Sequence, residues 1–174
     1  MDIGDLLKNP DKLKEALRRA IGNNDKKLAE TLIPIVRNPE LTYLYAAKII
    51  KGKIKDEWED IIAQDDVYSF YYARNILNGP FPKGEDVIAQ DPYSSYYYAK
   101  DVLNGPFPKG EDAIATNRDL PYYYAKEILK DRFRKGEKAI INYGRFLKEY
   151  IEFLKEIGKL DEFLKDHPEV KEEN

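Results

Sequence analysis

A motif of 26 residues recurs along the middle of the chain and restricts what this chain can fold into. Residues 65–74 return in similar form at 91–100 and again at 117–126, each time with tyrosines followed by alanine and a basic residue. The linker at 78–86 returns unchanged at 104–112. A period of this length is typical of a repeat array, in which each unit packs on the next.

Moving this frame back by 26 residues predicts a fourth copy at 39–64. In that copy Lys55 stands where the other linkers have phenylalanine, and Trp58 replaces a glycine. We expect Trp58 or Ile54 to fill the space that the missing phenylalanine would occupy. Residue types that recur in all four copies occupy three further positions: Ala47, Ala73, Ala99 and Ala125; Glu59, Glu85, Glu111 and Glu137; Ile62, Ile88, Ile114 and Ile140.

Each copy predicts a longer helix, a proline-containing turn and a short helix. In the third copy we expect a helix over 92–103, ended by Asn104 and Gly105 because both residues accept the left-handed conformation. The prolines beside Phe107 prevent the helix from resuming, and a short helix is expected at 111–115. Such a short helix needs packing against neighbours. The pattern therefore predicts an all-α, right-handed α-solenoid of helix–turn–short-helix repeats with period 26.

The predicted organisation is a single repeat domain over 1–174. Capping helices are expected in 1–38, four repeats in 39–142, C-terminal capping helices in 143–166 and a flexible tail in 167–174. Asparagine followed by proline at 9–10 and again at 38–39 predicts two capped helix starts. The helix predicted over 25–37 has four residues expected to face inward: Leu28, Leu32, Ile35 and Val36.

Composition argues against catalysis and metal binding. The chain has no cysteine and one histidine, His167, which precedes a proline in the predicted tail and is expected at the surface. The recurrent pairs Glu85-Asp86 and Glu111-Asp112 suit the positive ends of short helices. Adjacent helical residues diverge, so neither pair predicts a metal site. We therefore predict a non-enzymatic protein without a metal or cofactor.

Charge and hydropathy bear on partners and location. The net charge is −3, and acidic and basic residues alternate, which disfavours nucleic acid as a partner. Residues 1–5 lack the pattern of a signal peptide. No stretch approaches the ~18 apolar residues that a membrane-spanning helix needs. These observations predict a cytoplasmic protein with no membrane association.

The recurrent tyrosines are the one feature of the sequence that could have a role besides packing. On a helical wheel Tyr71 projects away from the core. The tyrosines at this position of the four copies could either seal the contacts between successive helices or form a binding strip for a protein or peptide. Interleaved tyrosine and lysine also suit single-stranded nucleic acid, which the acidic residues disfavour. The candidate protein-binding strip consists of Tyr45, Tyr71, Tyr97, Tyr123, Lys48, Arg74, Lys100 and Lys126.

Residues 97–115 resemble a tyrosine-rich short helical repeat found in bacteriophage and bacterial proteins, and their layout is similar to the leucine-rich repeat variant. The resemblance covers about 39–142 and brings no catalytic residues with it. It implies a protein-binding scaffold or a phage-type protein that binds and inhibits a host protein. The Lys/Glu-rich, cleanly capped terminal helices instead look like designed sequence, which would have no selected activity. Residues alone leave these interpretations open.

Overall fold

The computed structural model describes residues 9–171, which form helices and turns and contain no strand. The all-α class predicted from the sequence is therefore confirmed. Contacts divide the chain into two compact units, the first ending at Ile88 and the second beginning at Ala89. Residues 1–8 and 172–174 lie outside the described residues, and with them the expectation of no signal peptide at 1–5 and the last part of the predicted tail.

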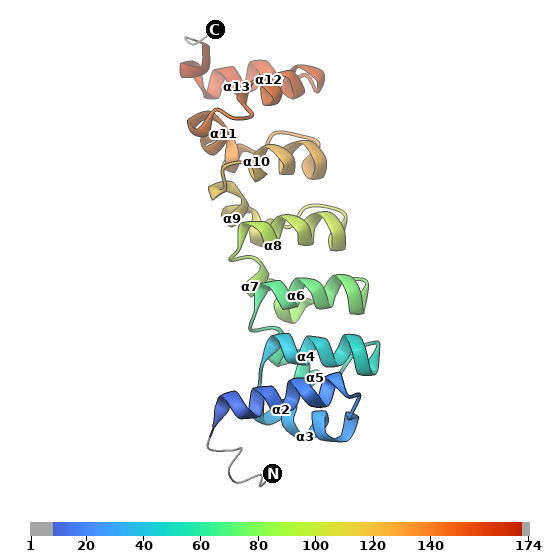
Figure 1. The fold of residues 1–174 in the computed structure, drawn as a ribbon. Helices are drawn as coiled ribbons and strands as arrows, with labels where there is room; N and C mark the ends of the chain where they lie inside the picture. The colour runs from blue at the N-terminus through green and yellow to red at the C-terminus, as the bar shows by residue number, and fades with distance from the viewer. Residues whose placement is uncertain (1–8, 172–174) are drawn as a thin grey trace. The chain divides into compact units, whose positions relative to one another are not determined.

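The first unit begins with two helices that pack on each other, α2 (Pro10–Gly22) and α3 (Lys26–Val36) (Figure 1). Both predicted caps are confirmed: the side chains of Asn9 and Asn38 accept hydrogen bonds from the N–H groups of Lys12 and Leu41. Helix α6 packs against α4 in this unit. The remaining elements are α4 (Pro39–Tyr45), η1 (Ala46–Ile50), α5 (Asp56–Ile62), α6 (Asp66–Tyr72), η2 (Ala73–Leu77), η3 (Pro82–Gly84) and α7 (Glu85–Ile88).

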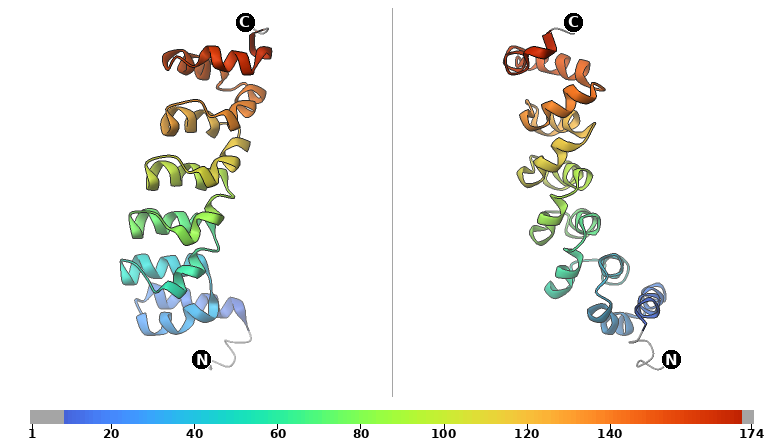
Figure 2. Two further views of the ribbon diagram at one scale, coloured as in Figure 1. Left: turned by 180° about the vertical axis from the view of Figure 1, so that it is seen from behind. Right: turned by 90° about the vertical axis from the view of Figure 1, so that its left-hand side faces the viewer.

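The second unit continues with the same alternation of longer and shorter elements. Helices α8, α10 and α11 form successive contacts, and α12 packs on α13 at the red end of the colour range (Figure 2). Its elements are α8 (Pro92–Tyr97), η4 (Tyr98–Leu103), η5 (Pro108–Gly110), α9 (Glu111–Thr116), α10 (Leu120–Tyr123), η6 (Tyr124–Leu129), η7 (Arg134–Gly136), α11 (Glu137–Tyr143), α12 (Leu147–Glu156), α13 (Leu160–Asp166) and η8 (Pro168–Lys171).

The first helices of the four repeat copies, α4, α6, α8 and α10, all end in the same way. Each passes into a π-helical turn and stops at a residue with left-handed backbone. In the third copy this residue is Asn104 at φ 50°, and its N–H and that of Gly105 both donate to the carbonyl of Ala99. The helix thus ends at Asn104, as predicted, and Asn104 is the residue of the pair that takes the left-handed conformation. The four left-handed residues are Lys51, Asn78, Asn104 and Lys130.

The first copy carries one extra residue. Its left-handed residue, Lys51, precedes Asn78 by 27 residues, whereas Asn78 and Asn104 are 26 apart. The frame of 26 therefore misaligns the first long helix by one position. Ala46, and not Ala47, is the buried alanine whose carbonyl closes the turn. Tyr45 consequently occupies a buried position, which the sequence frame assigned to the exposed set.

Trp58 replaces the phenylalanine ring that the first linker lacks. In the other linkers a phenylalanine packs against the buried tyrosine, and Phe81 meets Tyr72 edge-on with ring centroids 5.1 Å apart. Trp58 makes the same kind of contact with Tyr45, at 5.5 Å and 82° between ring planes. Ile54 provides the backbone hydrogen bond that Phe107 provides in a later linker: its N–H donates to the hydroxyl of Tyr72 at 3.1 Å, as that of Phe107 does to Tyr124. The two residues thus share the role that we expected of one.

The predicted inner face of the second helix was partly wrong. Ala29, Leu32 and Ile33 are buried in α3, whereas Leu28 and Ile35 are 42% and 45% exposed. This helix carries more apolar residues than one face can bury, and the small side chain of Ala29 lies on the face that packs in the unit. Helical spacing alone did not distinguish the two candidate faces.

Gly110 is required by close packing in the second unit. A Cβ added there would lie 2.5 Å from Ser95 Oγ and 2.6 Å from Phe107 Cδ1, both of which are buried. We expect Gly110→Ala to lower the free energy of unfolding by about 1–3 kcal/mol, because the core would be overpacked. Gly105→Ala is the matched control, since the nearest atom to its added Cβ is 3.9 Å away. Urea unfolding measures both, and equal effects would contradict the packing argument.

Candidate functional site

The tyrosines divide into a buried set and an exposed set. In the first unit the hydroxyl of Tyr72 donates to Glu59 Oε1 at 2.9 Å and accepts the N–H of Ile54. In the second unit Tyr150 donates to Glu137 at 2.9 Å in the same way. These hydroxyls are used inside the protein, so this set belongs to the scaffold. Its members, each with 0% exposure, are Tyr45, Tyr72, Tyr98, Tyr124 and Tyr150.

The first unit exposes a small group of rings on α4 and α6. Tyr71 is 38% exposed, and its ring centroid lies 6.1 Å from that of Tyr43 and 6.4 Å from that of Tyr68. Arg74 places its guanidinium 5.8 Å from the centroid of the Phe70 ring. Tyr71 and Arg74 are therefore both exposed and both lie beside the Phe70 ring, whose centroid is 5.5 Å from that of Tyr71.

The second unit exposes two tyrosines one helical turn apart. Tyr93 is 56% exposed and Tyr97 is 43% exposed, and both belong to α8. Lys100 follows on the same side and lies 2.7 Å from Glu127 Oε2. We call Tyr93, Tyr97 and Lys100 the tyrosine face.

Polar contacts fix the base of the tyrosine face. Tyr96, which is buried, donates its hydroxyl to Glu127 at 2.8 Å. Burial raises the pKa of Tyr96 to about 12, and the neighbouring Glu127 acts in the same direction. The hydrogen bond from Lys100 holds the pKa of Glu127 below its usual value. Lys100 is thus held above the Tyr96 ring, 5.6 Å from its centroid, in a defined position.

Tyr123 is less available than the sequence predicted. It is half-buried, and its ring lies 5.2 Å from that of Phe146, which precedes α12. Phe146 also stacks on Tyr122 at 4.9 Å with 10° between the planes. Lys126 Nζ donates to the Tyr122 hydroxyl at 3.0 Å. The C-terminal cap therefore covers part of the predicted strip.

The eight residues of the predicted strip do not form one set. Tyr45 is buried and donates its hydroxyl to Glu30 at 2.7 Å, so it cannot offer a surface ring. Lys48 is exposed beside an open depression of about 410 Å³ lined by Ile49 and Lys51. Tyr71 and Arg74 belong to the first unit. Tyr97, Tyr123, Lys100 and Lys126 belong to the second.

Two exposed or half-buried tyrosines, Tyr93 and Tyr43, lie beside residues of the predicted strip but were not included in it. Tyr93 is the most exposed large apolar residue among those described, and it was not included because the equivalent positions of the other copies are not tyrosine. Its spacing of four residues from Tyr97 is the signal that could have found it, since such residues share a helix face. Tyr43 could not be found from the repeat, because in the corrected register it aligns with Phe70 and Tyr96, which are buried.

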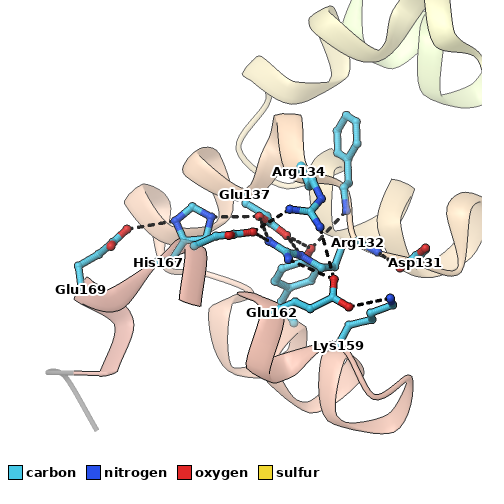
Figure 3. Close-up of polar contacts among 11 residues, drawn as sticks. Asp131, Arg132, Arg134, Glu137, Lys159, Glu162, His167 and Glu169 are labelled. Atoms are coloured by element: carbon cyan, nitrogen blue, oxygen red, sulfur yellow. Dashed lines mark hydrogen bonds and ion pairs between the residues drawn. The ribbon is translucent and has the colours of Figure 1, made fainter. Parts of the chain in front are cut away.

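A second polar site lies at the C-terminal end of the second unit (Figure 3). Arg132 and Glu137 form a bidentate ion pair with both N–O distances at 2.8 Å, and their side chains are 3% and 1% exposed. The hydroxyl of Tyr150 and Nε2 of His167 also reach Glu137, at 2.9 and 3.0 Å. Both oxygens of this carboxylate are therefore occupied by donors from three further residues.

An outer layer of charges surrounds this pair. Asp166 Oδ2 lies 2.9 Å from Arg132 Nη2 and 2.7 Å from Arg134 Nη1. Glu162 lies 3.4 Å from Arg134 and 2.9 Å from Lys159. We call the set formed by Arg132, Arg134, Glu137, Tyr150, Glu162, Asp166 and His167 the C-terminal ionic cluster (Figure 3).

Burial and hydrogen-bond donors together set the pKa values of the two groups at the centre of the cluster, Glu137 and Tyr150. Burial acts to raise the pKa of Glu137, but the hydrogen bonds from Arg132, His167 and Tyr150 outweigh it and lower this pKa. Burial likewise raises the pKa of Tyr150, with Glu137 adding to the effect. A carboxylate with its oxygens occupied in this way is a structural ion, because no oxygen is left to act on a substrate.

The expectation that His167 is a surface residue in a flexible tail was wrong. Its side chain is 15% exposed, and its ring lies 4.9 Å from the Phe163 ring. The chain continues as η8, in which Val170 is 3% exposed. The signal that could have revealed the cluster is Arg132, which stands where the two preceding linkers have Pro80 and Pro106.

Comparisons with known proteins found no match among protein-family models, curated proteins or solved structures. Within residues 9–171, no group of three or more histidine and acidic side chains could hold a metal ion. No helix in that part of the chain is long and apolar enough to span a membrane.

Proposed function

We propose that this chain is a non-catalytic helical-repeat scaffold that binds a protein or peptide through exposed tyrosines beside basic side chains. The observation that carries the proposal is the contrast along one helix of the second unit. Tyr98 is completely buried, whereas Tyr97 and Tyr93 are 43% and 56% exposed. A stable fold accounts for the buried ring and does not require the exposed ones.

Physical chemistry favours such a face as a contact site. Tyrosine and arginine or lysine neighbours supply much of the energy at protein interfaces, because a ring buries large area with few rotatable bonds. Tyr97 packs against Tyr96 with centroids 5.2 Å apart, which limits the entropy it would lose on binding. Lys100 is positioned by Glu127 and adds a polar contact at the edge.

The proposed architecture is a right-handed α-solenoid with period 26, interrupted by the extra residue in the first linker. The recurring tyrosine–glutamate bond supports it within each unit. Tyr124 repeats in the second unit what Tyr72 does in the first, donating to Glu111 at 3.4 Å and accepting the N–H of Phe107 at 2.9 Å. A hydroxyl that ties one copy to the linker before it is what stacked repeats require.

The proposed setting is the cytoplasm, and two origins fit this function. A phage-type protein would use the tyrosine face to bind and inhibit one host protein, as the resemblance of the repeats suggests. A designed scaffold would carry the same face without a selected partner. If the chain is a phage-type protein, the exposed rings are expected to bind a partner. If it is a designed scaffold, they need not bind anything.

A double substitution, Tyr93→Ala with Tyr97→Ala, tests the proposal. We expect the thermal melt to stay within a few degrees, because exposed side chains contribute little to stability. Recovery of a partner from bacterial lysate on the immobilised chain should fall at least about tenfold, which corresponds to the loss of one interface hot spot. Mass spectrometry of the captured proteins measures this recovery.

Tyr143→Ala is the matched control, since Tyr143 is 54% exposed but lies at the end of α11. A host protein captured at equal stoichiometry and lost only in the double variant would support the inhibitor. Equal recovery by the double variant and the wild type would refute the tyrosine face. A monomer that captures nothing at all would refute the binding function and leave only the scaffold.

A further inference from the structure

The turn that follows α13 is held to the second unit by two side chains, the hydrogen-bonded ring of His167 and the buried Val170. His167 is the last residue before η8, and its own N–H donates to the carbonyl of Phe163 at 2.9 Å. Its carbonyl accepts the N–H of Val170 at 3.2 Å, and Val170 is buried. The position of η8 therefore depends on how the His167 ring is held.

Both nitrogens of that ring face carboxylates. Nε2 lies 3.0 Å from Glu137 Oε2, and Nδ1 lies 3.2 Å from Glu169 Oε1 (Figure 3). A carboxylate can only accept hydrogen bonds, so each nitrogen must carry a proton to make its bond. Neutral imidazole carries one such proton and imidazolium carries two. Only the charged ring satisfies both contacts.

The surroundings of the ring favour the same state. Glu137 and Glu169 face it directly from α11 and η8, and Asp166 precedes it on α13. The positive charges of Arg132 and Arg134 are drawn to Glu137, Asp166 and Glu162. Tyr150 from α12 donates a neutral hydroxyl to Glu137. The centroid of the Phe163 ring lies 4.9 Å from that of the His167 ring, with 43° between the ring planes.

We propose that His167, Glu137 and Glu169 form a proton-dependent latch that holds η8 and Val170 against the second unit while His167 is protonated. Loss of the proton leaves a lone pair facing one of the two carboxylates. Glu169 is the more exposed partner, with 58% of its side chain accessible, so its contact is the one that breaks. The turn then opens and exposes Val170.

The sign of the pH dependence follows from this geometry. The latch binds the protonated ring, so it is closed while the ring carries both protons and opens as rising pH removes one of them. At much lower pH the carboxylates become protonated and the contacts are lost again. The latch is independent of the tyrosine face, so its failure and that of the proposed function are distinguishable.

Nuclear magnetic resonance tests the ring directly, because His167 is the only histidine in the chain. Long-range ¹H–¹⁵N correlations of the full chain should show both ring nitrogens protonated in the closed state. Amide hydrogen exchange, corrected for the intrinsic rate at each pH, then reports opening. We expect protection at His167 and Val170 to fall about tenfold on deprotonation, the difference between a charged and a neutral hydrogen bond.

Two variants make the outcome decisive. Glu169→Gln removes the exposed carboxylate without touching the core, and it should greatly reduce the pH dependence of protection at Val170. His167→Gln should abolish the pH dependence. The amides of Asn23 and Asp25, which cap α2 in the first unit, are the internal control. Protection at Val170 that does not change with pH in the wild type would overturn the latch, as would the same pH dependence in Glu169→Gln.

Discussion

Replacing Glu137 with alanine is expected to lower the free energy of unfolding by about 3–5 kcal/mol, because it leaves a buried arginine without its counter-ion. The Arg132 side chain is 3% exposed and makes two hydrogen bonds of 2.8 Å to this carboxylate. Asp166 at 2.9 Å would remain as a partner. It is 41% exposed, however, and compensates a buried charge less well than Glu137 does. Urea unfolding followed by circular dichroism measures the loss.

Glu111→Ala is the matched control, since it removes the same residue from the preceding copy. Tyr124 is 3.4 Å from Glu111, and Pro106 stands in place of a buried arginine. We expect a loss of about 1 kcal/mol, typical of one hydrogen bond. A double variant, Arg132→Leu with Glu137→Met, should be more stable than Glu137→Ala alone, because the buried arginine charge is removed together with its partner. Equal losses for Glu137→Ala and Glu111→Ala would contradict this account.

The same pair predicts part of the acid sensitivity of the fold. The pKa of Glu137 is lowered in the folded protein, so its contribution to stability is fully present above the unfolded value, about 4.3 for glutamate. That contribution is lost as the pH falls through the folded pKa. The Glu137→Ala variant should therefore lose less stability between neutral and acidic pH than the wild type. Measuring the free energy of unfolding of the wild type and of Glu137→Ala as a function of pH checks this difference.

The sequence predicted local structure better than it predicted surfaces. Helix starts at Asn9 and Asn38 and the all-α class follow from capping and periodicity, which are local properties. The burial of Tyr45 depends on a register that one extra residue had shifted, whereas the exposed Tyr93 has no tyrosine at the equivalent positions of the other copies. Tyr71 and Arg74 are exposed in a copy that keeps the frame.

The C-terminal ionic cluster lay beyond sequence reasoning for a different reason. Arg132 and His167 are 35 positions apart in the chain and meet only because α13 returns over α11 and α12. Proximity to the chain end and a following proline predicted a frayed tail. Burial of Val170 and the two carboxylates around His167 outweigh that tendency.

Trp58→Gly, which restores the residue found in the other linkers, is expected to destabilise the first unit by about 3–5 kcal/mol. The indole is 8% exposed and provides the only edge-on ring contact recorded for the buried Tyr45 within residues 9–171. Its removal leaves a cavity, and a glycine within α5 adds about 1 kcal/mol of helix cost. The melting temperature should fall by roughly 10 °C for a chain of this size.

Two controls separate the ring contact from the general cost of substitution. Trp58→Phe keeps an aromatic edge near Tyr45 and should lose no more than about 1.5 kcal/mol. Combining Trp58→Gly with Ile54→Phe places a phenylalanine four residues before a glycine, one residue further than at Phe107 and Gly110, where ring and glycine are in close contact. This double variant should regain part of the lost stability, because the new phenylalanine ring would reach Tyr45 from the linker instead of from α5. An unchanged melt in Trp58→Gly would show that Ile54 alone fills the space, and the extra residue of the first linker would then need another explanation.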